Sequence, residues 1–251
     1  MSTPAPTITE LRDALADQGI KLPDEQVALL DHYRQLLWEW NTRLNLTRHD
    51  DLVKFVRRDV VDSLAFSAAL APGEDVLDVG TGGGVPGVIL AIVRPDVSVS
   101  LCESVGKKAT AVADIVAQLG LAVPPHQVTL HHARAEALLE EGEVYDTLIV
   151  RAVARLDKLL TWFNPYWGSF HRLLVLKGPT WTAERQACRE KRLIQHLELR
   201  RLSSYTVSLA AGNETEGHES EGQESKGQVD AVTASSVLLQ IQPRREAPMG
   251  E

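Results

Sequence analysis

The chain has 251 residues, of which 44% are hydrophobic and 24% charged, and its formal net charge is −8. These proportions are ordinary for a globular protein, and no apolar run approaches the ~18 residues that a membrane-spanning helix needs. The amino-terminal residues lack the basic and apolar parts of a signal peptide. Two cysteines, Cys102 and Cys188, make no disulfide framework, and the eight histidines show no metal-binding spacing. We therefore expect a cytoplasmic monomer with one substantial core, no bound metal and no membrane attachment.

The first 70 residues predict helices. Thr7 and Glu10 have the spacing of a capping box, and apolar residues then recur at helical intervals. A second helix is expected after Pro23, and a third from about 51 to 70. Their apolar stripes are typical of core-facing side chains. We expect residues 1–70 to form an N-terminal helical subdomain.

From residue 75 onward, short apolar runs alternate with segments of helix length. The runs are 75–79, 97–102, 127–131, 145–150 and 171–176. This alternation indicates an α/β fold, in which helices cover both faces of a mostly parallel sheet. Two later runs, 203–209 and 235–241, predict a closing hairpin and a seven-stranded sheet. The domain would comprise residues 71–209 and 231–245.

Charge is distributed unevenly along the chain. Residues 210–230 carry six acids against one lysine and almost no apolar side chains, which predicts a disordered acidic insert. Outside it, basic residues concentrate in two stretches, Arg43 to Arg58 and Arg185 to Arg201. Each stretch is consistent with a solvated helix face or with contacts to RNA phosphates.

The most informative segment is Val76 to Gly87, where an apolar run breaks into a glycine-rich turn before an apolar, helix-like segment. Strand, tight turn and helix in this order form the first half of a nucleotide-binding unit, because glycines let the backbone approach a ligand closely. Gly82, Gly84 and Gly87 satisfy the dinucleotide pattern formally. Asp78 favours a different ligand, because a carboxylate before the turn suits the cationic S-adenosylmethionine better than a pyrophosphate. A dinucleotide and a purely structural turn remain the alternatives.

Charged side chains lie at the end of each of the first five predicted strands, at the edge where such sheets bind ligands. These residues are Asp78, Glu103, Arg134 with Glu136, Arg151 and Lys177. Enzymes that methylate exocyclic amines carry an Asn/Asp-Pro-Pro-Tyr element at the position of Arg151, which cannot accept amine protons. Asn164-Pro165-Tyr166-Trp167 looks similar but follows the next helix, so we interpret it as a turn. Neither cysteine is expected to face a substrate, which argues against pyrimidine C5 methylation through a thiolate.

Together these residues resemble the RsmG (GidB) family of 16S ribosomal RNA methyltransferases, from about residue 20 to 180. The resemblance rests on the order and spacing of Trp40-Asn41, Asn45-Leu46-Thr47, Arg58, Asp62-Ser63, Asp78 through Gly87, Glu103-Ser104, Lys107-Lys108, Arg134 with Glu136, Arg151-Ala152 and Lys177-Gly178. It implies a class I (Rossmann-like) methyltransferase fold. It also implies S-adenosylmethionine-dependent methylation of N7 of one guanosine (position 527 type) in the 530-loop region of 16S rRNA. The substrate would be the 16S rRNA in the small ribosomal subunit or in its assembly intermediate.

The resemblance also implies roles for residues at matching positions. Cofactor contacts would come from Asp78, Gly80, Gly82, Gly84, Val85, Glu103, Ala135, Glu136 and Arg151. The RNA side would include Asn45, Arg58, Arg134 and Lys177, and the catalytic candidates are Arg134, Arg151 and Lys177. Asp59 departs from the family, which usually has a histidine directly after the arginine that matches Arg58.

The chemistry of guanine N7 suits this set of residues. N7 has an in-plane lone pair and loses no proton on methylation, so the reaction needs no general base. In-line alignment of the reacting atoms is worth about 7–11 kcal/mol in well-oriented systems. Two other hypotheses remain open: a small-molecule methyltransferase of the same fold, and a cofactor-binding ribosome-assembly protein without turnover.

Overall fold

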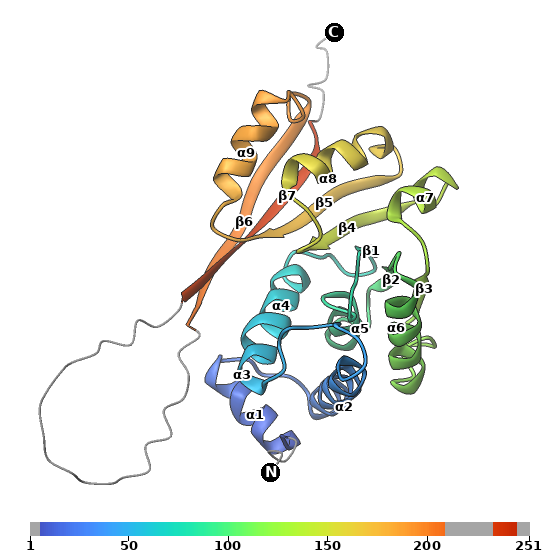
Figure 1. The fold of residues 1–251 in the computed structure, drawn as a ribbon, viewed down its shortest axis with the longest axis vertical. Coiled ribbons are helices and arrows are strands. Elements are labelled where there is room, and N and C mark those ends of the chain that lie inside the picture. Colours follow the sequence, from blue (N-terminus) through green and yellow to red (C-terminus); the bar gives the residue numbers. More distant parts are fainter. Residues whose placement is uncertain (1–5, 209–232, 245–251) are drawn as a thin grey trace, which may run out of the picture.

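A computed structural model describes residues 6–208 and 233–244, and the acidic stretch 210–230 lies outside them. The strands are β1 (Asp75–Val79), β2 (Ser98–Cys102), β3 (Val128–His131), β4 (Tyr145–Arg151), β5 (Phe170–Lys177), β6 (Leu197–Ser208) and β7 (Thr233–Pro243). They form one seven-stranded sheet in the order β3-β2-β1-β4-β5-β7-β6 (Figure 1). The first five strands pair in parallel, whereas β7 runs antiparallel to both β5 and β6. This arrangement confirms the class I methyltransferase fold and the closing hairpin.

The sheet divides the hydrophobic core into two layers. Side chains alternate between the faces of a strand, so Ile149 and Leu174 join one layer while Leu148 and Leu173 join the other. One face is covered by α5 (Gly87–Val93), α6 (Gly106–Gln118) and the N-terminal helices. The opposite face is covered by α7 (Ala135–Glu140), α8 (Leu156–Phe163) and α9 (Trp181–Glu190). Both faces of the central strands are therefore buried, which explains the nearly continuous apolar runs of β1, β4 and β5.

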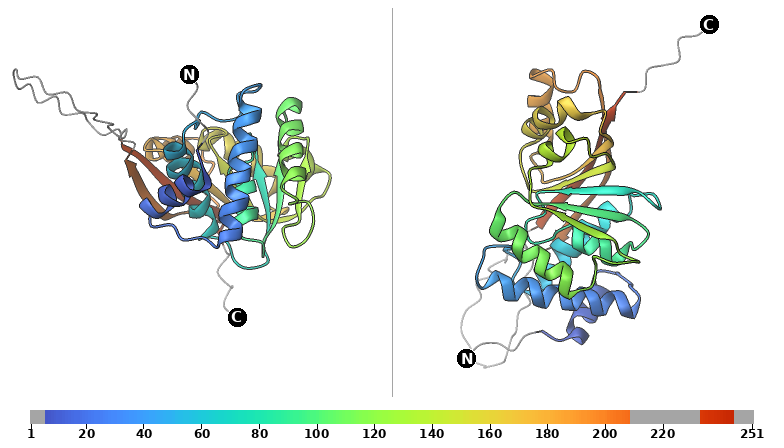
Figure 2. Two further views of the ribbon diagram at one scale, coloured as in Figure 1. Left: turned by 90° about the horizontal axis from the view of Figure 1, so that it is seen from below. Right: turned by 90° about the vertical axis from the view of Figure 1, so that its right-hand side faces the viewer.

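The N-terminal helices share the first of these two layers. They are α1 (Ile8–Asp17) and α2 (Asp24–Asn41), followed by α3 (Leu52–Lys54) and α4 (Val61–Ser67). The capping box forms as predicted, because Thr7 N donates to Glu10 Oε2 at 2.6 Å and Glu10 N donates to Thr7 Oγ1 at 3.3 Å. Helices α2 and α6 pack side by side, as the view from below shows (Figure 2). No helix in the described part of the chain is long and apolar enough to cross a bilayer.

The predicted third helix differs in its middle. Residues Phe55–Val60 form a π-helical segment between α3 and α4 instead of continuing the α-helix. Asp59 and Asp62 both point inward and are only 1% exposed. The periodicity of Phe55, Val56 and Val60 could not reveal this widening, since π-helical turns are set by tertiary partners and occur often at functional sites.

Candidate active site

A cleft of about 640 Å³ opens at the carboxyl ends of β1, β4 and β5. It is bordered by the segment after α2, by the glycine turn after β1, and by the first residues after β4 and β5. The residues that line it are Leu46, Thr47, Arg48, His49, Arg58, Asp59, Asp62, Gly80, Thr81, Gly82, Gly83, Val85, Lys108, Arg151, Ala152, Leu176, Lys177, Gly178, Glu184 and Ser236. The sequence motifs before and after the glycine turn therefore meet at one site.

The glycine turn needs its glycines for both conformation and space. Gly80 has φ +67°, and a Cβ there would lie 2.9 Å from Cγ2 of Val153. Gly84 has φ +101°, and a Cβ there would lie 2.7 Å from Cγ2 of Val88. Backbone in this left-handed region is costly for residues with a side chain. The turn thus presents bare backbone to the cleft.

Asp78 lies beneath this turn and does not line the cleft. Its Oδ2 accepts hydrogen bonds from Thr81 Oγ1 at 2.6 Å and from Gly87 N at 2.9 Å. Its Oδ1 is buried without a hydrogen-bond partner among the described residues. Burial raises the pKa of Asp78 from 3.8 to about 6, although the bonds from Thr81 and Gly87 oppose the shift. A buried carboxylate with one free oxygen is matched to a cation placed over the turn.

The pKa of Asp78 predicts a dependence of stability on pH. Because the folded-state pKa lies above the ordinary one, the contribution is fully present below about pH 4 and is lost as the pH rises through 6. For the ligand-free protein, Asp78 alone should lower the free energy of unfolding by roughly 1 kcal/mol between pH 5 and pH 7.5. Urea titrations of the wild type and Asp78→Asn measure this difference. Equal pH slopes for the two proteins would contradict it.

Glu103 ties the same turn to the end of β2. Its Oε2 accepts from Gly82 N at 3.0 Å and its Oε1 accepts from Val105 N at 2.8 Å. On the next strand over, β3 leads to α7, where Arg134 occupies the exposed N-cap position, Ala135 is buried and Glu136 is half-buried. The structure thus brings Glu103 and the start of α7 to adjacent strand ends beside the glycine turn, as the sequence predicts.

Arg151 is the centre of a buried ion-pair network. Its NH2 lies 2.8 Å from Asp59 Oδ1 and its Nε lies 2.9 Å from Asp62 Oδ2. The network extends through His49 Nδ1, 2.8 Å from Asp59 Oδ1, and Tyr205, whose hydroxyl donates to Asp62 Oδ1 at 2.6 Å. Burial acts to lower the pKa of Arg151, but the two carboxylates outweigh it and the pKa is raised. Arg151 therefore stays charged, with its side chain 14% exposed at the cleft.

Lys177 also reaches the cleft, and its ammonium group is already engaged. Nζ lies 2.8 Å from Glu184 Oε2 and donates to the carbonyl of Ala154 at 2.6 Å. The lysine therefore connects the end of β5 to α9 and to the loop after β4. Of the other predicted RNA-side residues, Arg58 lines the cleft, whereas Asn45 and Arg134 are exposed outside its lining.

Sequence reasoning missed His49, Tyr205 and Thr81 as parts of the site. His49 and Tyr205 contact Asp59 and Asp62 from segments that share no motif with the glycine turn. Thr81 had a usable signal, since a hydroxyl inside the turn and three residues after Asp78 is placed to bond its carboxylate. The role of Asn41 in the sequence motif is structural, because its Oδ1 accepts hydrogen bonds from the backbone N–H groups of Leu46 and Thr47.

Both cysteines are buried, in agreement with the sequence interpretation. Burial raises the pKa of Cys102 to about 12 and that of Cys188 to about 11. A thiol with such a pKa forms almost no thiolate near neutral pH. Neither cysteine therefore serves as a nucleophile.

Comparison with known proteins decides the family. The family model described as rRNA small subunit methyltransferase G (GidB) matches residues 26–210. The chain belongs to this family. The Ribosomal RNA small subunit methyltransferase G of Rhodopirellula baltica is 42% identical over 202 residues, which cover 80% of this chain and 85% of that protein. The protein with the same name from Chlorobium chlorochromatii is 37% identical over 164 residues, covering 64% of this chain and 68% of that one.

The solved structures that resemble the chain are far less similar in sequence than these relatives. The precorrin-6y C5,15-methyltransferase of Geobacter metallireducens is similar with a TM-score of 0.49 and 12% identity, covering 75% of this chain and 88% of that chain.

The cofactor follows from membership of the methyltransferase family: it is S-adenosylmethionine, as the sequence indicated. The cradle of bare backbone over Gly80 and the free buried oxygen of Asp78 fit that cofactor.

Proposed function

We propose that the chain methylates N7 of one guanosine, of the position-527 type, in the 530-loop region of 16S rRNA. The observation that carries the proposal is the composition of the cleft. Basic side chains line it beside the glycine turn, and its three carboxylates, Asp59, Asp62 and Glu184, are each held in an ion pair with Arg151 or Lys177. Such a cleft presents hydrogen-bond donors to an RNA. Its carboxylates are occupied by ion pairs and are not available as general bases, which suits a reaction that removes no proton from the base.

The cofactor would lie on the turn, with its methionine end over Asp78 and the residues from Gly80 to Val85. Glu103, whose two oxygens each retain acceptor capacity, would hold the ribose hydroxyls. Ala135 and Glu136 would border the adenine end. When bound, S-adenosylmethionine supplies an electrophilic methyl group on a positively charged sulfur.

The RNA side of the cleft is built from both halves of the chain. The helical segment 1–70 contributes Arg48, His49 and Arg58, and the methyltransferase domain, 71–209 with 231–245, contributes Arg151 and Lys177. We assign Arg151 to the boundary between cofactor and base, because Asp59 and Asp62 fix its guanidinium there. Asn45 and Arg134 would contact RNA beyond the cleft. These groups position the base and its phosphates, and the rate comes from alignment and fixed charges.

The target guanosine must be unpaired when it enters. N7 faces the major groove, which is deep and narrow in an RNA duplex and closed to side chains. A base splayed from a loop exposes that edge to the donor. The proposed setting is therefore a single-stranded segment of the small subunit or its assembly intermediate, met by a monomer in the cytoplasm.

Labelled methyl transfer tests the proposal. Purified protein, labelled S-adenosylmethionine and either naked 16S rRNA or small subunits from cells lacking this gene should give one labelled nucleoside. Mass spectrometry should identify it as 7-methylguanosine in the 530-loop region. Small subunits from cells that carry the gene serve as the control and should accept little label. Methylation of metabolites alone would support the small-molecule alternative, and donor binding without any transfer would support the assembly protein; either result overturns the proposal.

A further inference from the structure

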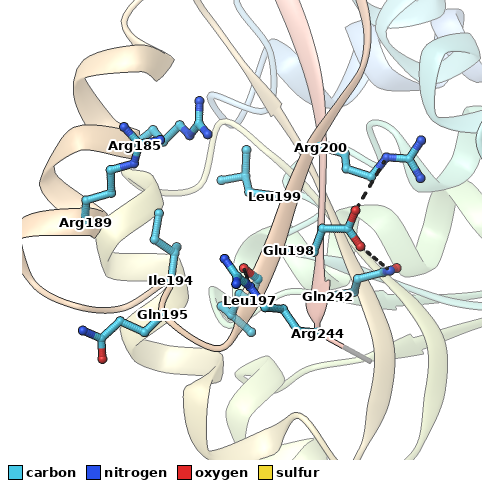
Figure 3. A pocket seen from close by; sticks show the side chains of 10 residues that line it. All are labelled: Arg185, Arg189, Ile194, Gln195, Leu197, Glu198, Leu199, Arg200, Gln242 and Arg244. Carbon is cyan, nitrogen blue, oxygen red and sulfur yellow. Dashed lines mark hydrogen bonds and ion pairs between the residues drawn. The ribbon is translucent and has the colours of Figure 1, made fainter. Parts of the chain in front are cut away.

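A second depression, of about 910 Å³, lies beside α9 at the outer edge of the sheet (Figure 3). We call it the arginine groove. It is lined by Arg185, Arg189, Ile194, Gln195, Leu197, Glu198, Leu199, Arg200, Gln242 and Arg244. Helix α9, the segment after it, edge strand β6 and the end of β7 each contribute. The groove shares no lining residue with the cleft.

The charges of the groove are unbalanced. Four arginines line it against one carboxylate, Glu198, which accepts from Gln242 Nε2 at 3.2 Å and lies 3.9 Å from Arg200 Nε. Arg185 and Arg189 stand four residues apart on one face of α9, and neither forms an ion pair within residues 6–208 and 233–244. In a chain of net charge −8, this is a local excess of positive charge. An excess of positive over negative side chains on one surface favours an anionic partner.

The floor of the groove indicates which part of an anionic polymer it fits. The floor is aliphatic, with Leu197 buried and Ile194 and Leu199 half-buried, and no aromatic side chain lines it. Stacking of bases on a protein needs aromatic faces, whereas phosphates need only fixed cations. Guanidinium groups suit phosphates because their donors are arranged in a planar fork. A nucleic-acid backbone therefore matches the groove better than unpaired bases do.

Helix α9 connects the groove to the cleft. Glu184 of α9 lines the cleft, where it pairs with Lys177, and the next residue, Arg185, lines the groove. The same short helix thus borders both depressions. Figure 3 shows Arg185 and Arg189 on the α9 side, whereas Arg200 projects from the side of β6 that faces away from α9. An RNA chain that leaves the cleft along α9 would therefore pass Arg185 and Arg189.

We propose that the arginine groove binds the phosphate backbone of the ribosomal RNA substrate outside the segment that carries the target base. This inference rests on the proposed function, because it assigns a second contact surface to the same RNA. It makes recognition bipartite: the cleft holds the reacting nucleotide, and the groove holds a neighbouring stretch of backbone. The groove should then contribute to RNA affinity and leave donor binding and the chemical step unchanged.

Salt-dependent binding of the double variant Arg185→Ala/Arg189→Ala tests the inference. Each phosphate contact to a single strand contributes about 0.7 to the slope of log affinity against log salt, so the slope should decrease by about 1.4 and affinity should fall about 25-fold at 0.1 M salt. The probe is a 16S rRNA fragment containing the 530 loop, followed by fluorescence anisotropy. In methyl transfer, KM for RNA should rise by a similar factor while kcat and the donor Kd stay constant.

The matched control is Arg12→Ala/Lys21→Ala, which removes the same charge from exposed positions near α1, at the far end of the molecule (Figure 1). Its salt slope should stay at the wild-type value. An unchanged slope for Arg185→Ala/Arg189→Ala overturns the inference, and so does an equal loss in the control. A change of sedimentation in the groove variant with unchanged RNA binding would instead assign the groove to a second copy of the chain. Because binding is measured separately from transfer, failure of the proposed function appears as RNA bound but not methylated.

Discussion

Replacing Arg151 by methionine should abolish methyl transfer and lower the free energy of unfolding by about 3–5 kcal/mol. The substitution leaves the carboxylates of Asp59 and Asp62, each 1% exposed, without their shared cation. Uncompensated buried charge is expensive, and the pair would repel each other across the vacated site. Urea denaturation measures the stability change, and labelled transfer to small subunits measures the activity.

Two further variants separate stability from function. Arg172→Met removes another partly buried arginine, whose NH2 pairs with Glu74 at 2.6 Å outside the cleft. It should destabilise the protein and leave transfer intact under conditions where the protein stays folded. The triple variant Arg151→Met/Asp59→Asn/Asp62→Asn removes the unpaired charge, so stability should recover while activity stays lost. Wild-type transfer by Arg151→Met, or equal loss of transfer in Arg172→Met, would show that Arg151 is only structural.

Arg151 also shows how far the sequence could lead. Its place at the end of an apolar run is sufficient to identify it as a candidate site residue, because parallel strands of an α/β fold present their carboxyl ends to ligands. Its ion-pair partners cannot be identified from the sequence in the same way. Asp59 and Asp62 lie 92 and 89 residues earlier in the chain. Asp59 was notable only as a departure from the family, and its pairing with His49 and Arg151 depends on how the N-terminal helices pack on the sheet.

The strands were predictable for a related reason. β1 has the predicted bounds, and β2 to β5 differ by one residue at one or both ends, because strands buried on both faces have continuous apolar runs that charged residues end. The arginine groove could be predicted only in part from the sequence. The basic stretch from Arg185 to Arg201 can be recognised from the sequence. Arg244 joins it only through the antiparallel pairing of β6 with β7, where Leu197 lies opposite Pro243.

Asp78 was recognised correctly as the signature of the turn, but its hydrogen bonds could not be read from the motif. Spacing places the acid before the glycines and does not show whether its oxygens face the ligand or the backbone. In the structure, Oδ2 bonds Thr81 and Gly87, because a tight turn and the start of a helix leave donors that need a nearby acceptor. The carboxylate therefore supports, from below, the turn on which we propose that the cofactor lies.

This arrangement makes Gly87→Ala the smallest substitution with a large expected effect. A Cβ at residue 87 would lie 2.7 Å from Asp78 Oδ2 and 3.1 Å from its Cβ, and closer still to Cδ2 of Leu101. All three atoms belong to buried strand residues that cannot move away freely. Either α5 shifts or Asp78 does, and both movements break the bond from Gly87 N to Asp78 Oδ2. We expect a loss of about 1–3 kcal/mol in the free energy of unfolding.

The effect of Gly87→Ala on cofactor binding should exceed its effect on stability. The turn from Gly80 to Val85 is held by Asp78 on one side and Glu103 on the other, so moving one carboxylate distorts the surface on which we propose that the cofactor binds. Calorimetry with S-adenosylhomocysteine should show affinity reduced at least tenfold. Gly168→Ala is the matched control, because a Cβ there meets nothing within 4 Å and the backbone has no left-handed φ. Wild-type affinity in Gly87→Ala would mean that the packing of α5 against β1 does not shape the cofactor site, and that the turn keeps its form without Asp78.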